Sequence, residues 1–336
     1  MASVPAVVPA EHSSDHVLVM PRPAAGAEAG SEAGPEQGRL ALPELAAAWF
    51  GDAGWLRAPA VAGPSRGGGG ARFHGVRAAP LAVPGILRLG DDHRATGPFP
   101  LEAGAAGALG CEHPADAWAL GRADGTLDAR GGRPATYDDR DGISRAFAAA
   151  LPVGEELRVV GWGVAVARRS RGLLLADGRH ALRPDPAASV DLTVRAARVV
   201  PAQELLEVVR AVVATAAGEA AAAGAPGHRV VARTPYDGDL VVGGEPAAGP
   251  PGAPGAPATV HRFAWVPQDP YELQVEQPSG VHAIARSRAR TLLARIALLL
   301  LERAGGAAVD DAGFPVGRRG LEGRLDSRGP GSRAWV

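Results

Sequence analysis

The feature that most constrains the fold of this chain is an apparent internal repeat between residues 141–178 and 279–313. Both segments open with a residue that can cap a helix, Asp141 or Ser279, followed by glycine and a branched apolar residue. Each then runs through a long stretch of apolar residues and arginine, reaches a glycine, and ends in a short apolar strand before a turn. The repeat predicts that one structural unit occurs twice.

The second half shows the remaining elements of its unit clearly. An alternating strand at 191–199 leads into a helix that Pro201 opens. Two strands at 228–235 and 239–245 then form a hairpin, because the Tyr236-Asp237-Gly238-Asp239 turn supplies the Asp-Gly pair that tight hairpins favour.

The first half has weaker counterparts of the same elements. We interpret 85–92 as its first strand, 101–109 as a helix, and 116–122 with 126–130 as a hairpin. The long segment 154–171 is interpreted as helical, although its glycines and valines also suit a strand, and that alternative stays open.

Each half therefore has the order strand, helix, hairpin, helix, strand, which is the split βαβ order of a ferredoxin-like unit. We predict an α+β fold with two tandem ferredoxin-like units at 75–187 and 188–316. Residues 1–40 are rich in Ala, Gly, Pro and Glu, and we predict a disordered, low-complexity segment there. Residues 317–336 are predicted to be a flexible tail rich in Arg and Gly.

Composition excludes several mechanisms. The chain has no lysine, so all 35 cationic side chains are arginine, which suggests a GC-rich bacterial genome. Lysine-dependent chemistry is thereby excluded, including the P-loop lysine and Schiff-base catalysis. The single cysteine, Cys111, cannot form an internal disulfide. A net charge of -1 with 4% aromatic residues argues against nucleic-acid binding.

No segment has the features of a membrane anchor or a secretory signal. The most apolar run, residues 291–301, is 11 residues long and contains Arg295, whereas a membrane-spanning helix needs ~20 apolar residues. The apolar stretch at residues 4–10 is interrupted by two prolines and is not a usual signal peptide. We expect a cytoplasmic protein that does not associate with membranes.

The densest polar segment is the candidate ligand-binding site. It consists of Tyr137, Asp138, Asp139, Arg140 and Asp141, together with Arg145. The competing interpretation is that Asp141 caps the following helix, with the neighbouring acids favoured by the helix dipole. The segment lacks the alternating acids and closing glutamate of an EF-hand, so we predict no metal site.

Three other motifs are interpreted as loops or linkers. Asp91-Asp92-His93 and Cys111-Glu112-His113 contain metal-ligand residue types without a recognised ligand spacing. Gly63-Pro64-Ser65-Arg66-Gly67 matches the pattern of a hydrolase nucleophile elbow but lacks the flanking strand and helix that expose such a serine. We therefore assign no site to any of the three and expect no cofactor.

One resemblance to a known family joins the predicted architecture to a motif. Arg140-Asp141-Gly142 resembles the end of the G-x-x-D-G motif of dye-decolorising haem peroxidases, which are built from two ferredoxin-like units. The resemblance implies that Asp141 acts at the distal haem face and that His228, His261 or His282 is the proximal ligand. Asp138 stands where the motif has its glycine.

The absence of a convincing catalytic constellation favours a non-enzymatic role. We expect a cytosolic interaction or accessory protein that binds a partner protein through sheet edges or helix faces. The alternative is an enzyme or small-ligand-binding protein with a cleft between the two units, of which a haem peroxidase would be one version. The fold class by itself is evidence for neither function.

Overall fold

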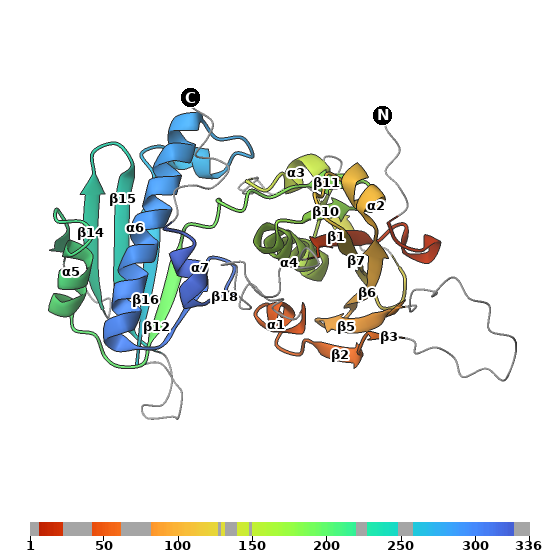
Figure 1. Ribbon diagram of the computed structural model, residues 1–336, viewed down its shortest axis with the longest axis horizontal. Coiled ribbons are helices and arrows are strands. Elements are labelled where there is room, and N and C mark those ends of the chain that lie inside the picture. Colours follow the sequence, from red (N-terminus) through yellow and green to blue (C-terminus); the bar gives the residue numbers. More distant parts are fainter. Residues whose placement is uncertain are drawn as a thin grey trace, which may run out of the picture. The chain divides into compact units, whose positions relative to one another are not determined.

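The chain forms two compact units, each a seven-stranded antiparallel sheet with helices packed on it (Figure 1). The first unit ends at Asp185 and the second begins at Pro186. The predicted α+β class is confirmed. The structure is a computed structural model that describes residues 7–22, 42–61, 82–126, 129–131, 140–147, 150–219, 227–247 and 258–325.

The first sheet has the strand order β11-β10-β1-β7-β6-β5-β2. Its strands in chain order are β1 (His16–Pro21), β2 (Gly54–Arg57), β5 (Gly85–Leu89), β6 (His93–Leu101), β7 (Ala115–Arg122), β10 (Leu173–Ala176) and β11 (His180–Leu182). Two small sheets accompany it, and they pair β3 (Ala60–Val61) with β4 (Ala82–Val83) and β8 (Arg130–Gly131) with β9 (Leu151–Pro152).

Both faces of the first sheet are covered. Helix α4 (Gly154–Ser170) lies on one face, and α1 (Leu42–Ala47) packs beside it, where the indole of Trp162 donates to the Leu45 carbonyl at 3.1 Å. On the other face, a core cluster joins the sheet to residues from the chain start and from α2 (Ala103–Ala108). The remaining short helices are η1 (Ala10–His12) and α3 (Ile143–Ala146).

Strand β1 corrects the prediction that residues 1–40 are disordered. It is the third strand of the sheet, bonded to β10 on one side and β7 on the other. Val17, Leu18 and Val19 are all fully buried, because helices or loops cover both faces of the sheet. A strand that is buried on both faces lacks the alternation by which sequence patterns reveal strands.

The segment 154–171 is a helix, which settles the alternative that the sequence left open. Its acidic first turn and basic last turn both match the helix dipole. Gly163 lies where the helix approaches the sheet, since a β-carbon there would come within 3.1 Å of the Leu174 and Leu120 methyl groups. The glycine that suggested a strand therefore permits close packing of the helix.

The second sheet has the order β13-β14-β15-β16-β12-β17-β18. Its strands are β12 (Leu192–Ala196), β13 (Ala217–Glu219), β14 (His228–Thr234), β15 (Gly238–Pro246), β16 (Thr259–Val266), β17 (Ala307–Asp310) and β18 (Pro315–Val316). Helices α5 (Ala202–Arg210) and α6 (Gly280–Ala304) contribute to one core with the sheet, and η2 (Pro270–Leu273) and α7 (Arg318–Glu322) are short.

The two sheets have the same topology. In each, the first strand, β1 or β12, lies between the strand that precedes the long helix and the strand that follows it. Beyond the preceding strand lies a meander, β2-β5-β6-β7 or β13-β14-β15-β16, and a short hairpin partner, β11 or β18, closes the other edge. The segments 141–178 and 279–313 contain α4 with β10 and α6 with β17.

The ferredoxin-like part of the fold prediction is not confirmed. A four-strand meander stands in each sheet where a ferredoxin-like unit has a hairpin, and each sheet has an additional edge strand. In the first half, the segment 85–92 contains the inner strand β5, and the predicted hairpin partner of β7 does not pair with it. The predicted first unit starts at residue 75 and therefore leaves out β1.

The predicted flexible tail is also corrected in part. Residues 318–322 form helix α7, whose Leu321 is fully buried. Arg324 is buried as well, and its guanidinium donates to the Val190 carbonyl at 3.1 Å and to the Ser189 hydroxyl at 3.3 Å. The rest of that prediction, residues 326–336, lies outside the described part of the chain.

In the ranges that the structure describes, no helix combines the length and apolarity that crossing a bilayer requires.

The central position of β1 generates a stability prediction. Leu18→Ala should lower the free energy of unfolding by about 3 kcal/mol, because it removes a fully buried side chain and leaves a cavity. Leu56→Ala, at a position that is 57% exposed on the edge strand β2, is the matched control and should change it by less than about 0.5 kcal/mol. Urea denaturation of both variants measures the difference, and equal stabilities would contradict the placement of β1.

Candidate functional site

The predicted acidic segment is described only in part. Tyr137, Asp138 and Asp139 lie outside the described residues. Asp141 does not cap a helix: α3 begins at Ile143 after Gly142, which makes no side-chain capping bond. Its carboxylate instead accepts a hydrogen bond from Arg168 Nη2 at 2.5 Å. Asp141 therefore neutralises a buried arginine of α4, and the ligand-binding role of the segment stays a prediction.

Arg140 and Arg145, the other two described residues of the predicted ligand-binding site, flank Asp141 in the sequence. Arg140 Nε is 3.9 Å from the Asp141 carboxylate, so it adds a second cation to this ion pair. Arg145 is in the last turn of the four-residue helix α3.

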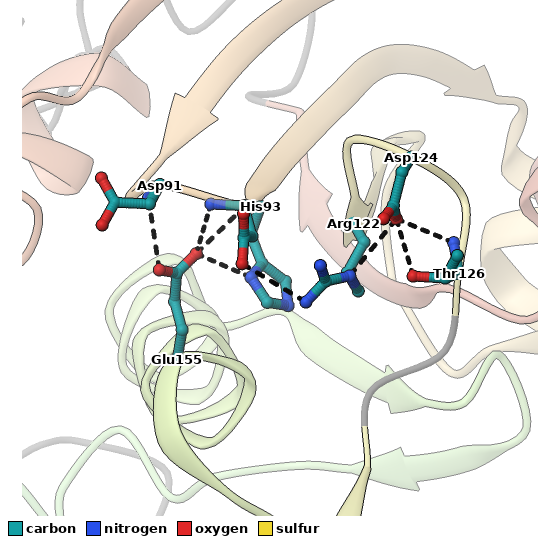
Figure 2. Close-up of polar contacts among 7 residues, drawn as sticks. Asp91, His93, Arg122, Asp124, Thr126 and Glu155 are labelled. Carbon is teal, nitrogen blue, oxygen red and sulfur yellow. Dashed lines mark hydrogen bonds and ion pairs between the residues drawn. The ribbon is translucent and has the colours of Figure 1, made fainter.

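Two adjacent glutamates in the first turn of α4 hold the helix to the sheet through histidines. Figure 2 shows Glu155, whose Oε1 is 2.7 Å from Nδ1 of the buried His93 at the start of β6. The same carboxylate accepts hydrogen bonds from the backbone amides of Asp91, Asp92 and His93 at 3.0 to 3.2 Å. The Asp91-Asp92-His93 loop thus binds a carboxylate and fixes the start of α4 to the β5–β6 turn.

The contacts of Glu155 determine its charge. Partial burial by itself would raise the pKa of this carboxyl, but hydrogen bonds from His93 and from the amides of Asp92 and Asp91 outweigh it and leave the pKa below its ordinary value. Glu155 is therefore ionised at neutral pH, as its four donors require.

A second turn in Figure 2 is held by an exposed carboxylate. Asp124 accepts hydrogen bonds from the Thr126 amide and hydroxyl and from Arg122, and these lower its pKa. The contacts of Asp124 lie within five consecutive residues, so this carboxylate orders only the turn after β7; Arg122, 3.5 Å from Asp92, and the Ala123 amide, 2.7 Å from the Asp92 carbonyl, join that turn to the β5–β6 turn.

The second glutamate, Glu156, belongs to a more buried ion network. Its Oε1 is 3.1 Å from His16 Nε2 on β1 and 2.7 Å from Arg130 Nη2 on β8. Arg130 Nη2 also lies 2.8 Å from Asp177, and the Asp177 amide donates to His16 Nδ1 at 3.0 Å. The Phe147 ring packs edge-on against His16 and beneath the Arg130 guanidinium.

This network has the residue types of a metal site, but a cation is already present. One ligand atom each from His16, Glu156 and Asp177 lies within 4.8 Å of the others. Arg130 Nη2 contacts both carboxylates, so it supplies the positive charge that a metal ion would bring. The arrangement supports a structural link among β1, β8, α4 and the β10–β11 turn.

Sequence reasoning missed this network for identifiable reasons. His16 falls in a segment predicted to be disordered, and Glu156 in a segment whose helical character was open. The available signal was the Glu155-Glu156 pair, since acids gather in the first turn of a helix. Nothing in the local sequence pairs it with a histidine 140 residues away.

The histidines of the peroxidase resemblance lie in the second unit, whereas Asp141 lies in the first. The His282 ring packs against the Trp265 ring on the α6 side of the sheet, with 4.9 Å between the ring centroids. His228 and His261 lie on β14 and β16 with ring centroids 6.0 Å apart. Burial lowers the pKa of His228, and burial with the neighbouring His228 lowers that of His261 to about 4.

The Cys111-Glu112-His113 motif lies in the loop before β7. Cys111 is buried on the second face of the first sheet, and burial raises the pKa of its thiol, which keeps it protonated. Glu112 and His113 follow it in the loop before β7. The nucleophile-elbow pattern at 63–67 falls outside the described residues.

An exposed apolar surface lies at one end of the second unit. It consists of Tyr236 (81% exposed), Tyr271 (67%), Val281 (76%) and Ile284 (45%), which we call the apolar end. Figure 1 shows the β14–β15 turn and the start of α6 at the same end of this unit.

Polar contacts hold the elements of the apolar end together. Arg288 of α6 lies 3.3 Å from Asp237, the neighbour of Tyr236. Val281, Ile284 and Arg288 are spaced by three and four residues, so they share one side of the helix, which faces the turn. Gln268 donates to the Pro235 carbonyl, and Glu272 accepts from the Ser279 amide.

Comparison with known proteins gives no relative: no family model, no curated protein and no solved structure matches this chain.

The contribution of the Glu155 hydrogen bonds to stability can be tested by mutation. Glu155→Ala should lower the free energy of unfolding by about 2 kcal/mol, because three amides and His93 lose their acceptor. Asp124→Ala is the matched control, since it removes an exposed carboxylate that contacts only its own turn, and should leave stability nearly unchanged. Thermal or urea denaturation compares them, and similar losses in both variants would contradict this role.

The lowered pKa of His261 predicts a pH dependence of stability. In the unfolded chain this histidine protonates near 6.5, but in the folded protein only near 4. The free energy of unfolding is therefore highest above about pH 6.5 and falls towards pH 4, by about 1.4 kcal/mol per pH unit and ~3 kcal/mol in total. His261→Leu should reduce that slope, and His180→Gln, an exposed position in the first unit, should retain it. Denaturation at several pH values measures the slopes, and identical slopes in all three proteins would refute the assignment.

Proposed function

We propose that this chain is a cytosolic accessory protein that binds a partner protein through the apolar end of its second unit. The observation that carries the proposal is the exposure of Tyr236, Tyr271, Val281 and Ile284 on elements that contact one another. Two of the three tyrosines of the chain are in this set. Clustered exposed apolar side chains with a polar border are typical of protein-binding surfaces.

The chemistry of the apolar end suits protein recognition. Tyrosine is enriched at the energetic centres of interfaces, because its ring buries a large area while its hydroxyl forms a hydrogen bond. Val281 and Ile284 add exposed aliphatic surface at the start of α6 without adding charge. The partner surface is therefore expected to be apolar with a few hydrogen-bonding groups.

The frame that presents these side chains is already ordered. The Arg288–Asp237 ion pair, the Gln268 contact with Pro235 and the Glu272 contact with Ser279 hold the hairpin turn, η2 and the start of α6 together. Binding to an ordered surface loses less conformational entropy than binding to a mobile one. This favours recognition by shape over folding of a segment on binding.

The proposal predicts that single changes at the apolar end abolish partner capture. Ile284→Arg and Tyr236→Ala should each reduce by at least tenfold the amount of a partner that co-purifies from the native host, since each removes apolar contact area. Tagged full-length protein, stabilised by mild crosslinking and analysed by quantitative mass spectrometry, gives the measurement.

The control is Leu56→Arg, which places the same charge on an exposed apolar residue of the first unit. It should capture the partner as well as the unchanged protein does. Equal losses in Leu56→Arg and Ile284→Arg would show a general charge effect and contradict the proposal. Absence of a reproducible partner, together with turnover of a substrate by the purified protein, would favour the enzymatic alternative.

A further inference from the structure

The second unit contains two histidines on two strands of its sheet, and a glycine on the strand between them pairs with both. His228 on β14 is paired in register with Gly244 on β15, and Gly244 with His261 on β16. A β-carbon at Gly244 would lie 2.5 Å from His228 Nε2 and 2.9 Å from His261 Nδ1. Both ring nitrogens therefore lie against the same glycine, whose missing side chain leaves room for the two rings.

Among the residues that the structure describes, neither of these two nitrogens has a hydrogen-bond partner, although both are buried. His261 is 0% exposed, so water does not replace the missing partner from the surface. Buried polar atoms of folded proteins nearly always have a partner, whether a protein group, an ordered water or a bound ion. Two such atoms beside the same glycine are the observation from which we infer a bound group.

The contacts of His261 determine which of its nitrogens carries the lone pair. The Thr259 hydroxyl donates to the Arg198 carbonyl at 3.1 Å, so its oxygen accepts from His261 Nε2 at 3.0 Å. The proton of His261 is thereby assigned to Nε2, and the lone pair lies on Nδ1. Metal-binding histidines are oriented in this way, by a hydrogen bond from the ring nitrogen that does not bind the ion.

We propose that His228 Nε2 and His261 Nδ1 bind a divalent transition-metal ion above Gly244. Zn²⁺, Co²⁺ and Ni²⁺ all accept neutral imidazole nitrogen at about 2.0 to 2.1 Å, whereas Mg²⁺ and Ca²⁺ prefer oxygen. Burial favours the neutral form of both rings, which is the form that binds metal. Two protein ligands leave positions for water, so the site is separate in chemistry and in place from the apolar end.

Co²⁺ is the probe for the test, because bound Co²⁺ absorbs visible light. Full-length protein is freed of metal with a chelator and titrated with Co²⁺, and then with Zn²⁺ in competition. We expect one Co²⁺ per chain for the unchanged protein and for His180→Gln, which alters an exposed histidine elsewhere. His228→Gln should bind at least tenfold more weakly.

Gly244→Ala is the sharper variant, since it keeps both histidines but places a methyl group 2.5 Å from His228 Nε2 and 2.9 Å from His261 Nδ1, so the two rings must move apart. It should also bind at least tenfold more weakly, with an unchanged circular dichroism spectrum. Histidine NMR signals of the unchanged protein give a second readout if a variant fails to fold, and Zn²⁺ should shift those of His228 and His261 among the nine histidines. Absence of stoichiometric binding, or equal binding by Gly244→Ala, would overturn the proposal and leave a water molecule as the bound group.

Discussion

Each unit of this protein depends on the pairing of its first strand along both edges. β1 joins the meander that ends in β7 to the strand β10 that follows α4, and β12 does the same between β16 and β17. A buried strand cannot leave its backbone donors and acceptors unpaired, so neither half of a sheet is complete without the strand between them. The register that pairs Val17 with Leu175 also makes the contact order high, because almost the whole unit lies between the two residues.

The two units satisfy their buried polar groups by different means. In the first, Glu155 and Glu156 at the start of α4 pair with His93 and His16, and Arg130 adds a positive charge. Charges that are buried in this way are stable only while every partner is present. In the second unit, His228 and His261 are kept neutral by burial and converge over Gly244. One topology therefore carries an ion network in one copy and a pair of neutral histidines in the other.

The surface of this protein combines paired charges with a few exposed apolar side chains. All cations of the chain are arginine, and several are used in pairs with carboxylates, such as Arg288 with Asp237. The apolar end exposes four large apolar side chains, two of them tyrosines. The partner interaction proposed for that end would therefore depend on buried apolar area more than on charge.

The sequence by itself determined the elements whose residues are patterned locally. The strand β12, the helix after Pro201, the β14–β15 hairpin and the long helix α6 were all expected close to their observed bounds, because their alternation, period or turn residues are read within a few positions. Strand β16 alternates as clearly, but the predicted unit was already complete with a two-stranded hairpin and did not include it.

The tertiary structure decided which segments meet. It made β1 central although its residues show no alternation, directed Asp141 to Arg168 in place of a helix end, and brought His16 to Glu156 and His228 towards His261. Such contacts depend on strand order and register, which are set by burial of both sheet faces over the whole unit and not by neighbours in the chain. The candidate sites lie among these contacts, so local sequence patterns could not reveal them.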